Sequence, residues 1–390
     1  MKLLVVSHTP HYLRGSQVVG FGPTVRELSH LAGLFDSVVH LAPLYLGAAP
    51  DSALPYEGPF ADRIEQRPLP PTGGDGLLAK LGILLRAPTV SRRLRREVAA
   101  ADAWHLRAPA NVALLAMAFF PFMPSRPCWI KYAGNWRPEG KEPWSYRWQR
   151  RWLLRPRREV AVTVNGRWPD DPPHVTAFRN PSFTLDELAA ARDSSAERRL
   201  PVGGEKLELL FVGRLDEPKG GGRAIEILAG LRRGGVDARL ELVGGGEGRE
   251  AFAALAASLG VADRVAFAGE LPRPALADLY RKAHFLLLPS HSSEGWPKVL
   301  SEAMAYGALP LAGAVSSIPR GLAEAGAGRA LPPLAVAGFV AAVNEYLARP
   351  DLYAAESRRA RDSAADFTYD RHLAAVRQLF ETRWKLQLAP

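Results

Sequence analysis

Two glutamates eight positions apart, Glu294 and Glu302, lie in a segment that follows an apolar run and then takes on helical spacing, residues 289–307. Carboxylates placed in this way fit two kinds of chemistry. They can act as a general acid and a general base, or they can accept hydrogen bonds from hydroxyl groups at two ends of one ligand. A loop acid and a helix acid at this spacing also occur without any ligand, so the surrounding residues decide what the pair does.

The helix that contains Glu302 begins next to a proline and a lysine. Pro297 suits the first helical position, where its missing N–H needs no partner. The amides of Lys298, Val299 and Leu300 would then point out of the helix start and form an anion site that the helix dipole favours. The Lys298 cation opposes that dipole. A bound diphosphate would remove this conflict, whereas a merely solvated lysine would tolerate it.

A second candidate site is the segment FVGRLDEPKGGGRAIE at 211–226, where a glycine turn follows an apolar run. Arg214 and Lys219 flank this turn, and two cations at the end of a strand can bind a diphosphate and stabilise its charge as it leaves. The segment is not a Walker P-loop, because the GxxxxGK(S/T) pattern is absent. The alternative is a basic loop with a flexible glycine run. The sequence LVGGGEGRE at 242–250 superficially resembles a dinucleotide-binding glycine loop. A simple strand-to-helix turn explains it at least as well.

These candidates lie in a chain of alternating strand-like and helical patterns, which is typical of parallel α/β sheets. In the N-terminal half, an apolar run at 2–7 leads into a Gly/Pro-rich segment at 9–23, predicted to be a loop, and then into a helix at 24–34. Ligands of such sheets bind at the carboxyl ends of the strands, where both candidate loops lie. The clearest predicted strands are 207–212, 239–243, 264–267, 284–288 and 309–311.

In their order along the chain, these segments resemble the family-4 retaining glycosyltransferases (glycosyl transferases group 1), which have the GT-B fold. The resemblance covers about 207–332 and runs from VGR…KG at 212–220, through VGGG and VxFxG, to LPS…EG…LSEAMAYG at 288–307. Each motif is weak alone, but the ordered set is specific. It implies two doubly wound Rossmann-like domains facing across a cleft.

The polar stretch at 186–206 predicts where one domain ends and the next begins. The resemblance then implies an acceptor-binding domain at 1–190, a linker at 191–206 and a nucleotide-sugar-binding domain at 207–368. A helix within 369–390 is expected to return to the N-terminal domain.

The resemblance also implies a role for each candidate residue. Arg214 and Lys219 hold the donor diphosphate, Glu302 binds the ribose hydroxyls, and Glu294 contacts sugar hydroxyls. Catalysis is assigned to Glu294, Arg214 and Lys219, with the leaving diphosphate assisting attack on the same face of the sugar. Because two cations and a helix start hold the diphosphate, no metal and no cofactor are expected. The remaining donor-binding positions are Gly213, Gly295, Trp296, Pro297, Lys298, Val299, Glu270, Leu271 and Gly22.

The chain departs from the family pattern in two places. Family members often read EGFG where this chain has Trp296 and Pro297 after the first glutamate, so the indole is expected to reshape the sugar pocket and the donor sugar stays open. Many members also have a histidine at the end of the strand matching 129–132, and this chain has none there. Polar contacts on the acceptor side are expected from Lys131 and Asn135 instead. Two further acceptor-side candidates end another strand, His105 and Arg107, although His105 is equally well explained as a core histidine.

The net charge of +10 favours anionic partners, and ten arginines are concentrated at 92–96 and 147–158. Trp144, Trp148 and Trp152 recur every four residues within 144–158. Such a helix suits an anionic membrane surface, and it equally suits a structural helix with tryptophans in the core and arginines in water. A basic nucleic-acid-binding protein is the rival from another class, but the recognised nucleic-acid modules are absent, so no nucleic-acid partner is expected.

The expected activity is transfer of a hexosyl group from a UDP- or GDP-linked sugar to a saccharide or polyprenyl-linked acceptor, in cell-surface polysaccharide or glycolipid synthesis. A GT-B-like nucleotide-sugar epimerase or hydrolase is the alternative among enzymes. One cysteine, Cys128, and an N-terminus unlike a secretory signal predict a cytoplasmic protein, peripheral at most on the inner membrane face. The longest apolar run, 110–124, is too short to span a bilayer and is expected to form a buried helix.

Overall fold

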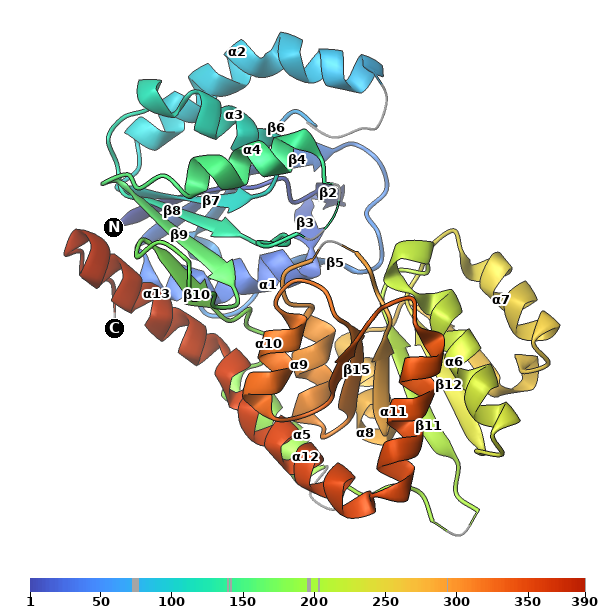
Figure 1. The fold of residues 1–390 in the computed structure, drawn as a ribbon. Helices are drawn as coiled ribbons and strands as arrows, with labels where there is room; N and C mark the ends of the chain where they lie inside the picture. Colours follow the sequence, from blue (N-terminus) through green and yellow to red (C-terminus); the bar gives the residue numbers. More distant parts are fainter. Residues whose placement is uncertain are drawn as a thin grey trace. The chain divides into compact units, whose positions relative to one another are not determined.

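The computed structural model describes residues 1–71, 77–138, 140, 142–194, 198–202, 204–292 and 294–389, and for 77–84 the backbone alone. The chain forms two compact units (Figure 1), Met1–Phe178 with His372–Pro390, and Arg179–Arg371. Each unit has its own sheet and its own core, which confirms the predicted doubly wound α/β class. Within the described residues, the structure has no helix that is both long enough and apolar enough to cross a membrane.

The second unit is built on a parallel sheet, which has six strands in the part of the chain that the structure describes. Its strand order is β13-β12-β11-β14-β15-β16, so the first strand in sequence lies in the middle and the order reverses beside it. This is the 3-2-1-4-5-6 order of doubly wound folds. The strands are β11 (Leu207–Val212), β12 (Ala238–Val243), β13 (Val265–Gly269), β14 (Phe285–Leu288), β15 (Leu309–Gly313) and β16 (Arg329–Leu331). The helices are α5 (Leu185–Asp193), α6 (Gly221–Arg233), α7 (Arg249–Ser258), α8 (Arg273–Lys282), α9 (Lys298–Ala305), α10 (Ile318–Ala325), α11 (Val336–Ala348) and α12 (Pro350–Ser363).

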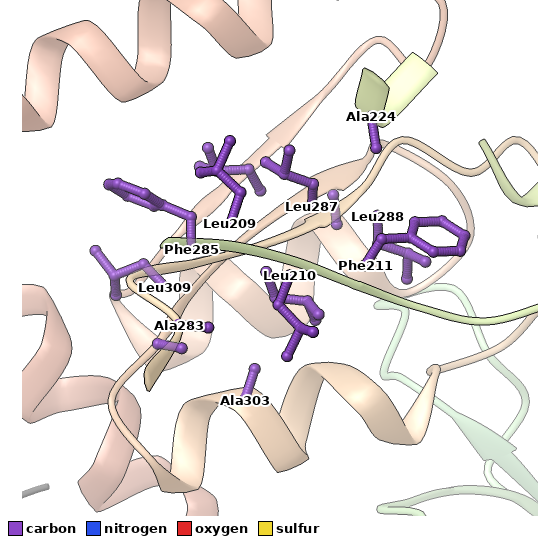
Figure 2. Packing of buried hydrophobic residues seen from close by; sticks show 14 of the residues in the cluster. Leu209, Leu210, Phe211, Ala224, Ala283, Phe285, Leu287, Leu288, Ala303 and Leu309 are labelled. Atoms are coloured by element: carbon purple, nitrogen blue, oxygen red, sulfur yellow. The ribbon is translucent and has the colours of Figure 1, made fainter. Parts of the chain in front are cut away.

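The central strands of this unit are apolar on both faces because helices cover both sides of the sheet. Leu209 and Leu210 point to opposite sides of β11, and Ala303 of α9 lies on the side of Leu210 (Figure 2). Helix α6 packs with α7 and α11, whereas α9 packs with α5 and α12. Burying one leucine side chain contributes about 2 kcal/mol relative to leaving it exposed, so the strands form a rigid base for the loops at their carboxyl ends.

The first unit has a parallel sheet in the order β10-β9-β8-β7-β1-β4, with β6 also pairing with β4. On strand β1 the side chains alternate: Leu4 and Val6 enter one core, and Leu3 and Val5 enter the other. The strands are β1 (Lys2–Val6), β4 (Ser37–Tyr45), β6 (Ile64–Leu69), β7 (Ala103–Ala108), β8 (Cys128–Tyr132), β9 (Val160–Asn165) and β10 (Val175–Phe178). The helices are α1 (Gly22–Leu31), α2 (Leu77–Ala99), α3 (Asn111–Ala118), α4 (Trp144–Leu153) and α13 (Tyr369–Trp384).

The last helix of the chain, α13, packs in the first unit. Phe380 lies against Phe35, with ring centroids 5.7 Å apart. Val376 and Phe380 belong to the same core as Leu3 and Val5 of β1. The C-terminal segment therefore closes one face of the first sheet.

The segment after β1 is not the predicted loop. Residues 9–23 contain a hairpin of β2 (His11–Arg14) and β3 (Gln17–Phe21), whose far strand pairs with β5 (Ala53–Pro55). Gly15 at the turn has a φ of +63°, which glycine adopts without a steric cost. The Gly-Ser pair between two β-rich runs is a known hairpin signal, and the prediction weighted the glycines and prolines around it too heavily.

The boundary between the units lies earlier than the predicted 191–206 linker, of which residues 195–197 and 203 are outside the described residues. The second unit already includes α5, whose Leu188 and Ala191 are buried in its core. Thr184 caps this helix, since its side chain accepts from the Glu187 amide and the Glu187 side chain accepts from the Thr184 amide. Because much of α5 is polar, the composition of this segment did not indicate that one side of the helix is buried.

The apolar run at 110–124 forms only a short helix, α3, followed by the 3-10 turn η3 (Phe120–Phe122). Val112, Ala113 and Ala116 are buried as expected, but Phe122 is 69% exposed. The run therefore begins in the core and ends on the surface, because Pro121 ends regular helix and turns the chain outward.

The tryptophan-arginine segment forms α4, and its tryptophans do not share one exposed face. Trp152 is buried in the core to which α3 and α4 both contribute side chains, and Trp148 packs partly against that core. Only Trp144 is largely exposed. The Arg157 guanidinium stacks on the Trp152 ring at 3.7 Å. These contacts favour the structural interpretation of this helix over the membrane-binding one.

Candidate functional site

The two candidate loops of the second unit lie side by side because β11 and β14 are neighbours in the sheet. One loop follows β11 and leads into α6, and the other follows β14 and leads into α9. The strand order reverses between these two strands. Doubly wound folds bind ligands at this switch point, outside the carboxyl ends of the strands.

Local bonds shape the loop after β11. Asp216 accepts a hydrogen bond from the Lys219 amide at 3.0 Å and so caps a short 3-10 turn, η4 (Glu217–Lys219). Gly220 then takes a left-handed φ of +89° to begin α6, and a Cβ there would clash with the carbonyl oxygen of Pro289. Only glycine fits both demands, so the approach of the neighbouring loop requires the glycine of the KG pair.

The loop after β14 is braced against the loop after β11. Arg223 donates to the carbonyl oxygen of Pro289 at 2.8 Å, and the Ser290 hydroxyl donates to the carbonyl oxygen of Pro218 at 3.1 Å. His291 adds a backbone bond to the same Pro218 carbonyl at 3.0 Å. These bonds hold the two loops in one fixed arrangement.

This arrangement brings Lys219 and Glu294 together as an ion pair between Nζ and Oε1. Arg214 lies nearby, 77% exposed and paired with Asp216 at 2.8 Å. Burial, followed by the Arg214 charge, lowers the pKa of Lys219 to about 8, and Asp216 opposes this lowering. Two cations thus share one loop, and burial together with the Arg214 charge disfavours the ammonium form of Lys219.

Glu302 has partners of its own. One carboxylate oxygen accepts a hydrogen bond from the Tyr280 hydroxyl at 2.9 Å, and the other lies 3.7 Å from an Arg273 nitrogen. Burial, followed by the Glu302 charge, holds the pKa of Tyr280 well above its usual value, so this hydroxyl stays a donor. The carboxylate borders a hollow of about 410 Å³, also lined by Tyr306. A carboxylate has about four acceptor positions, so Glu302 keeps capacity for ligand hydroxyls. Sequence reasoning found neither Tyr280 nor Arg273, which stand outside the motifs.

The start of α9 differs in detail from the prediction. Pro297 is the capping residue and Lys298 the first helical one, and the Leu300 amide donates to the Pro297 carbonyl oxygen at 3.1 Å. The Leu300 amide is therefore used within the protein and is not part of the predicted anion site.

The Trp296 indole does not take the predicted place in a sugar pocket. It is 5% exposed and stacks on Phe367 with ring centroids 5.3 Å apart. A Cβ on Gly321 would clash with its ring, so α10 approaches it closely. Asn180 donates to the Trp296 carbonyl oxygen, and Ser317 donates to the carbonyl oxygen of Gly295. The tryptophan anchors the loop from below, and any ligand contact at 295–296 comes from the backbone.

The remaining donor-side candidates lie on the loops after β12 and β13. Gly244 has a φ of +133°, and a Cβ there would clash with the carbonyl oxygen of Gly213. The VGGG turn therefore serves close packing of two loops. Glu270 is exposed and lies beside Gly245, and Leu271 is partly buried against the core.

In the first unit, three of the acceptor-side candidates meet at the carboxyl ends of the strands. Glu27 of α1 binds Lys131 at 2.7 Å and Arg107 at 2.8 Å. Lys131 is buried, and burial lowers its pKa although Glu27 opposes the shift. His105 stacks on Trp129 at 3.8 Å, and burial with nearby positive charge holds its pKa well below the usual value. One carboxylate thus faces two cations.

A second polar cluster adjoins this one and was not predicted. The Ser7 hydroxyl lies 2.7 Å from one nitrogen of His40, whose other nitrogen lies 2.6 Å from the Tyr56 hydroxyl. His11 bonds the same hydroxyl at 2.9 Å. The only sequence feature that pointed to this cluster was a histidine inside an apolar run, and hydrophobic periodicity assigns no meaning to such a residue. Across the described residues, the structure shows no group of three or more His, Cys, Asp or Glu side chains placed to hold a metal ion.

The two other predicted positions of this unit make contacts within the protein fold. Asn135 is 8% exposed, and its side chain accepts from the Arg137 amide at 3.0 Å. Gly22 begins α1, and a Cβ there would meet Leu54 and the Ser52 carbonyl oxygen. The structure thus brings His105, Arg107 and Lys131 together, and leaves Asn135 in a local turn.

Comparison with known proteins relates this geometry to one family. Residues 194–363 match the family described as glycosyl transferases group 1. A D-inositol 3-phosphate glycosyltransferase of Kribbella flavida is 32% identical over 216 residues, which is 52% of this chain and 51% of that protein. The chain thus spans about half the length of the curated relatives it matches.

Solved structures extend the likeness to the whole fold. Sucrose-phosphate synthase from Thermosynechococcus elongatus matches with a TM-score of 0.73 and 17% identity, covering 98% of this chain and 99% of that one. Anabaena Alr3699/HepE, solved in complex with UDP-glucose, matches with a TM-score of 0.67 and 15% identity, covering 99% and 100%. At these identities the likeness is one of fold, and it is the two-domain GT-B fold.

Proposed function

We propose that the chain transfers a sugar from a nucleotide diphosphate donor, because residues 194–363 match the glycosyl transferases group 1 family and the chain has the GT-B fold. The observation that carries the proposal is the pair Lys219–Glu294, with Arg214 beside it, at the switch point of the second sheet. Cations suit a departing diphosphate, and a carboxylate suits the hydroxyls of a sugar.

The donor is proposed to be a UDP- or GDP-linked hexose. Arg214 and Lys219 bind its diphosphate, the start of α9 adds backbone amides, and Glu302 accepts from the ribose hydroxyls. Support comes from the desolvated Lys219 ammonium and from Glu302, which borders an open hollow. The complexes of Alr3699/HepE with UDP and with UDP-glucose make a uridine nucleotide the first donor to test.

The transfer is proposed to retain the configuration of the sugar and to need no metal ion. Two cations and a helix start stabilise the leaving diphosphate, and that diphosphate assists attack on the same face of the sugar. Glu294 already pairs with Lys219. It therefore serves as a group that orients sugar hydroxyls and the ammonium, rather than as a base.

The acceptor is proposed to be a saccharide or lipid-linked saccharide that bears a phosphate, in cell-surface polysaccharide or glycolipid synthesis. Arg107 and Lys131 share the single carboxylate of Glu27, so the strand ends of the first unit carry excess positive charge. An anionic group beside Arg107, which is 15% exposed, would balance that charge. The D-inositol 3-phosphate glycosyltransferases among the relatives make a phosphorylated acceptor the first to test.

A thermal-shift panel of nucleotide sugars, followed by product analysis, tests the proposal. One UDP- or GDP-sugar is expected to raise the melting temperature in the presence of EDTA, and the shift should shrink in Glu302→Gln. NMR of products made from that donor should show a glycoside with retained configuration when an acceptor is present. Free sugar alone would indicate a hydrolase, and isomerised donor an epimerase. Failure of every donor to bind would refute the proposal.

A further inference from the structure

A basic and apolar surface covers the outer side of the first unit, on α2 and on the turn η3 that follows α3. Helix α2 lies outermost in this unit and contacts α3 (Figure 1). Its inner side is a buried stripe of Val90, Leu94 and Val98, spaced four residues apart. The side chains between them face outward, because residues of a helix turn by about 100° each.

The outward side chains of α2 are cationic. Arg86, Arg92, Arg95 and Arg96 are exposed, and Arg96 is 78% accessible. In the described side chains of this helix, residues 85–99, the one carboxylate is that of Glu97, which is 3% exposed and paired with Arg67 and, at 3.6 Å, with Arg96. This one buried carboxylate offsets the charge of Arg96 only in part, so Arg86, Arg92 and Arg95 leave the outer face of the helix positively charged.

Apolar side chains stand among these arginines. Leu85 is 74% exposed and Phe122 of η3 is 69% exposed. A hollow of about 230 Å³ joins the two elements, lined by Arg92, Arg95 and Phe122 with Pro88, Ser91, Phe119 and Met123. Guanidinium groups and exposed rings share one surface, as they do in helices that lie in the headgroup region of a bilayer.

Helix α4 of the same unit is the weaker candidate, although it is also rich in arginine. Two of its three tryptophans pack toward the core, and Arg150 is paired with Glu142. What remains outside is one ring, Trp144, with Arg147 and Arg151. The two helices thus have similar charge but differ in how much apolar side chain they expose, so α4 serves as a matched control for α2.

We propose that the α2–η3 surface, defined by Leu85, Arg86, Arg92, Arg95, Arg96 and Phe122, docks the protein on an anionic lipid bilayer. The arginines contact lipid phosphates, and Phe122 and Leu85 enter the boundary between headgroups and acyl chains. The docking is independent of the sugar-donor site, which lies in the other unit.

Cosedimentation of the full chain with vesicles tests this surface. Vesicles of phosphatidylcholine alone are compared with vesicles containing one third phosphatidylglycerol, at low and high salt. Each arginine near an anionic surface is worth about fivefold in partitioning, so Arg92→Gln with Arg95→Gln should lower it by about 25-fold. Phe122→Ser should lower it at both salt concentrations. The control pair, Arg147→Gln with Arg151→Gln on α4, should stay within twofold of the original protein.

Circular dichroism and the thermal shift with UDP verify that each variant is folded. The proposal is overturned if the protein does not bind the phosphatidylglycerol vesicles, or if the α4 pair loses as much partitioning as the α2 pair. A loss through the arginines with no effect of Phe122→Ser would also overturn it, because a surface that binds anions alone does not enter a bilayer. Displacement from vesicles by equimolar duplex DNA would instead assign the surface to nucleic acid.

Discussion

The affinity for UDP is predicted to fall as the pH rises from 7 to 9, because Lys219 loses its proton in this range. Burial lowers the pKa of Lys219 to about 8 in the free protein. A diphosphate prefers the ammonium form, so it raises that pKa on binding, and by linkage it binds most tightly below pH 8. The protonated fraction falls from about 0.9 at pH 7 to about 0.1 at pH 9, which corresponds to roughly a tenfold loss of affinity.

Isothermal titration with UDP at pH 7, 8 and 9 and constant ionic strength measures this loss. A charge-assisted hydrogen bond is worth about 1.5–3 kcal/mol, so the bond to Lys219 is strong enough to produce a tenfold effect. Lys219→Arg is the matched control, since a guanidinium stays charged throughout and should make the affinity independent of pH. A flat profile for the original protein, or an unchanged slope in Lys219→Arg, would refute the assignment of Lys219 to the diphosphate.

Three further predictions concern other parts of the two units. Glu302→Gln should weaken UDP binding by about tenfold through loss of charge-assisted bonds, but should leave the affinity for 2′,3′-dideoxy-UDP unchanged; equal losses by calorimetry would contradict ribose contact. Gly220→Ala should cost about 1–2 kcal/mol for its left-handed backbone and about 1–3 kcal/mol more for its clash. Gly235→Ala, also left-handed but with open space around it, should show only the first cost in urea unfolding. Glu27→Gln should destabilise the protein by about 3 kcal/mol at pH 7, because it leaves two cations without their carboxylate. That destabilisation should shrink toward pH 10 as Lys131, whose pKa burial lowers, gives up its charge.

The sequence placed the two candidate loops correctly between a strand and a helix, and the binding of a donor there stays a prediction. Arg214, Lys219 and Glu294 lie in short segments between an apolar strand and a helix, and the strand order then places both segments together. The glutamate pair is a different matter. Spacing treats Glu294 and Glu302 as one unit, whereas the fold gives them separate partners, Lys219 for the first and Tyr280 for the second.

The sequence could not predict the direction in which a side chain points. Trp296 lies between two predicted ligand residues, yet its ring is held by Phe367 and Gly321, far from it in sequence. The arginine-rich helices show the same limit. Tryptophans at every fourth position predict one face, but only the packing of α3 against α4 decides that this face is largely buried.

By itself, the sequence determined the α/β alternation, the family resemblance and the loops that carry cations and carboxylates, because each depends on residues within a few turns of chain. Tertiary structure alone decided the boundary at α5, the hairpin after β1 and the meeting of Glu27 with Lys131, which is 104 positions away. It also decided that apolar side chains stand exposed beside the arginines of α2, whereas two of the three tryptophans of α4 pack toward the core. Contacts of this kind are set by which faces become buried when the strands assemble, and that depends on the whole chain at once.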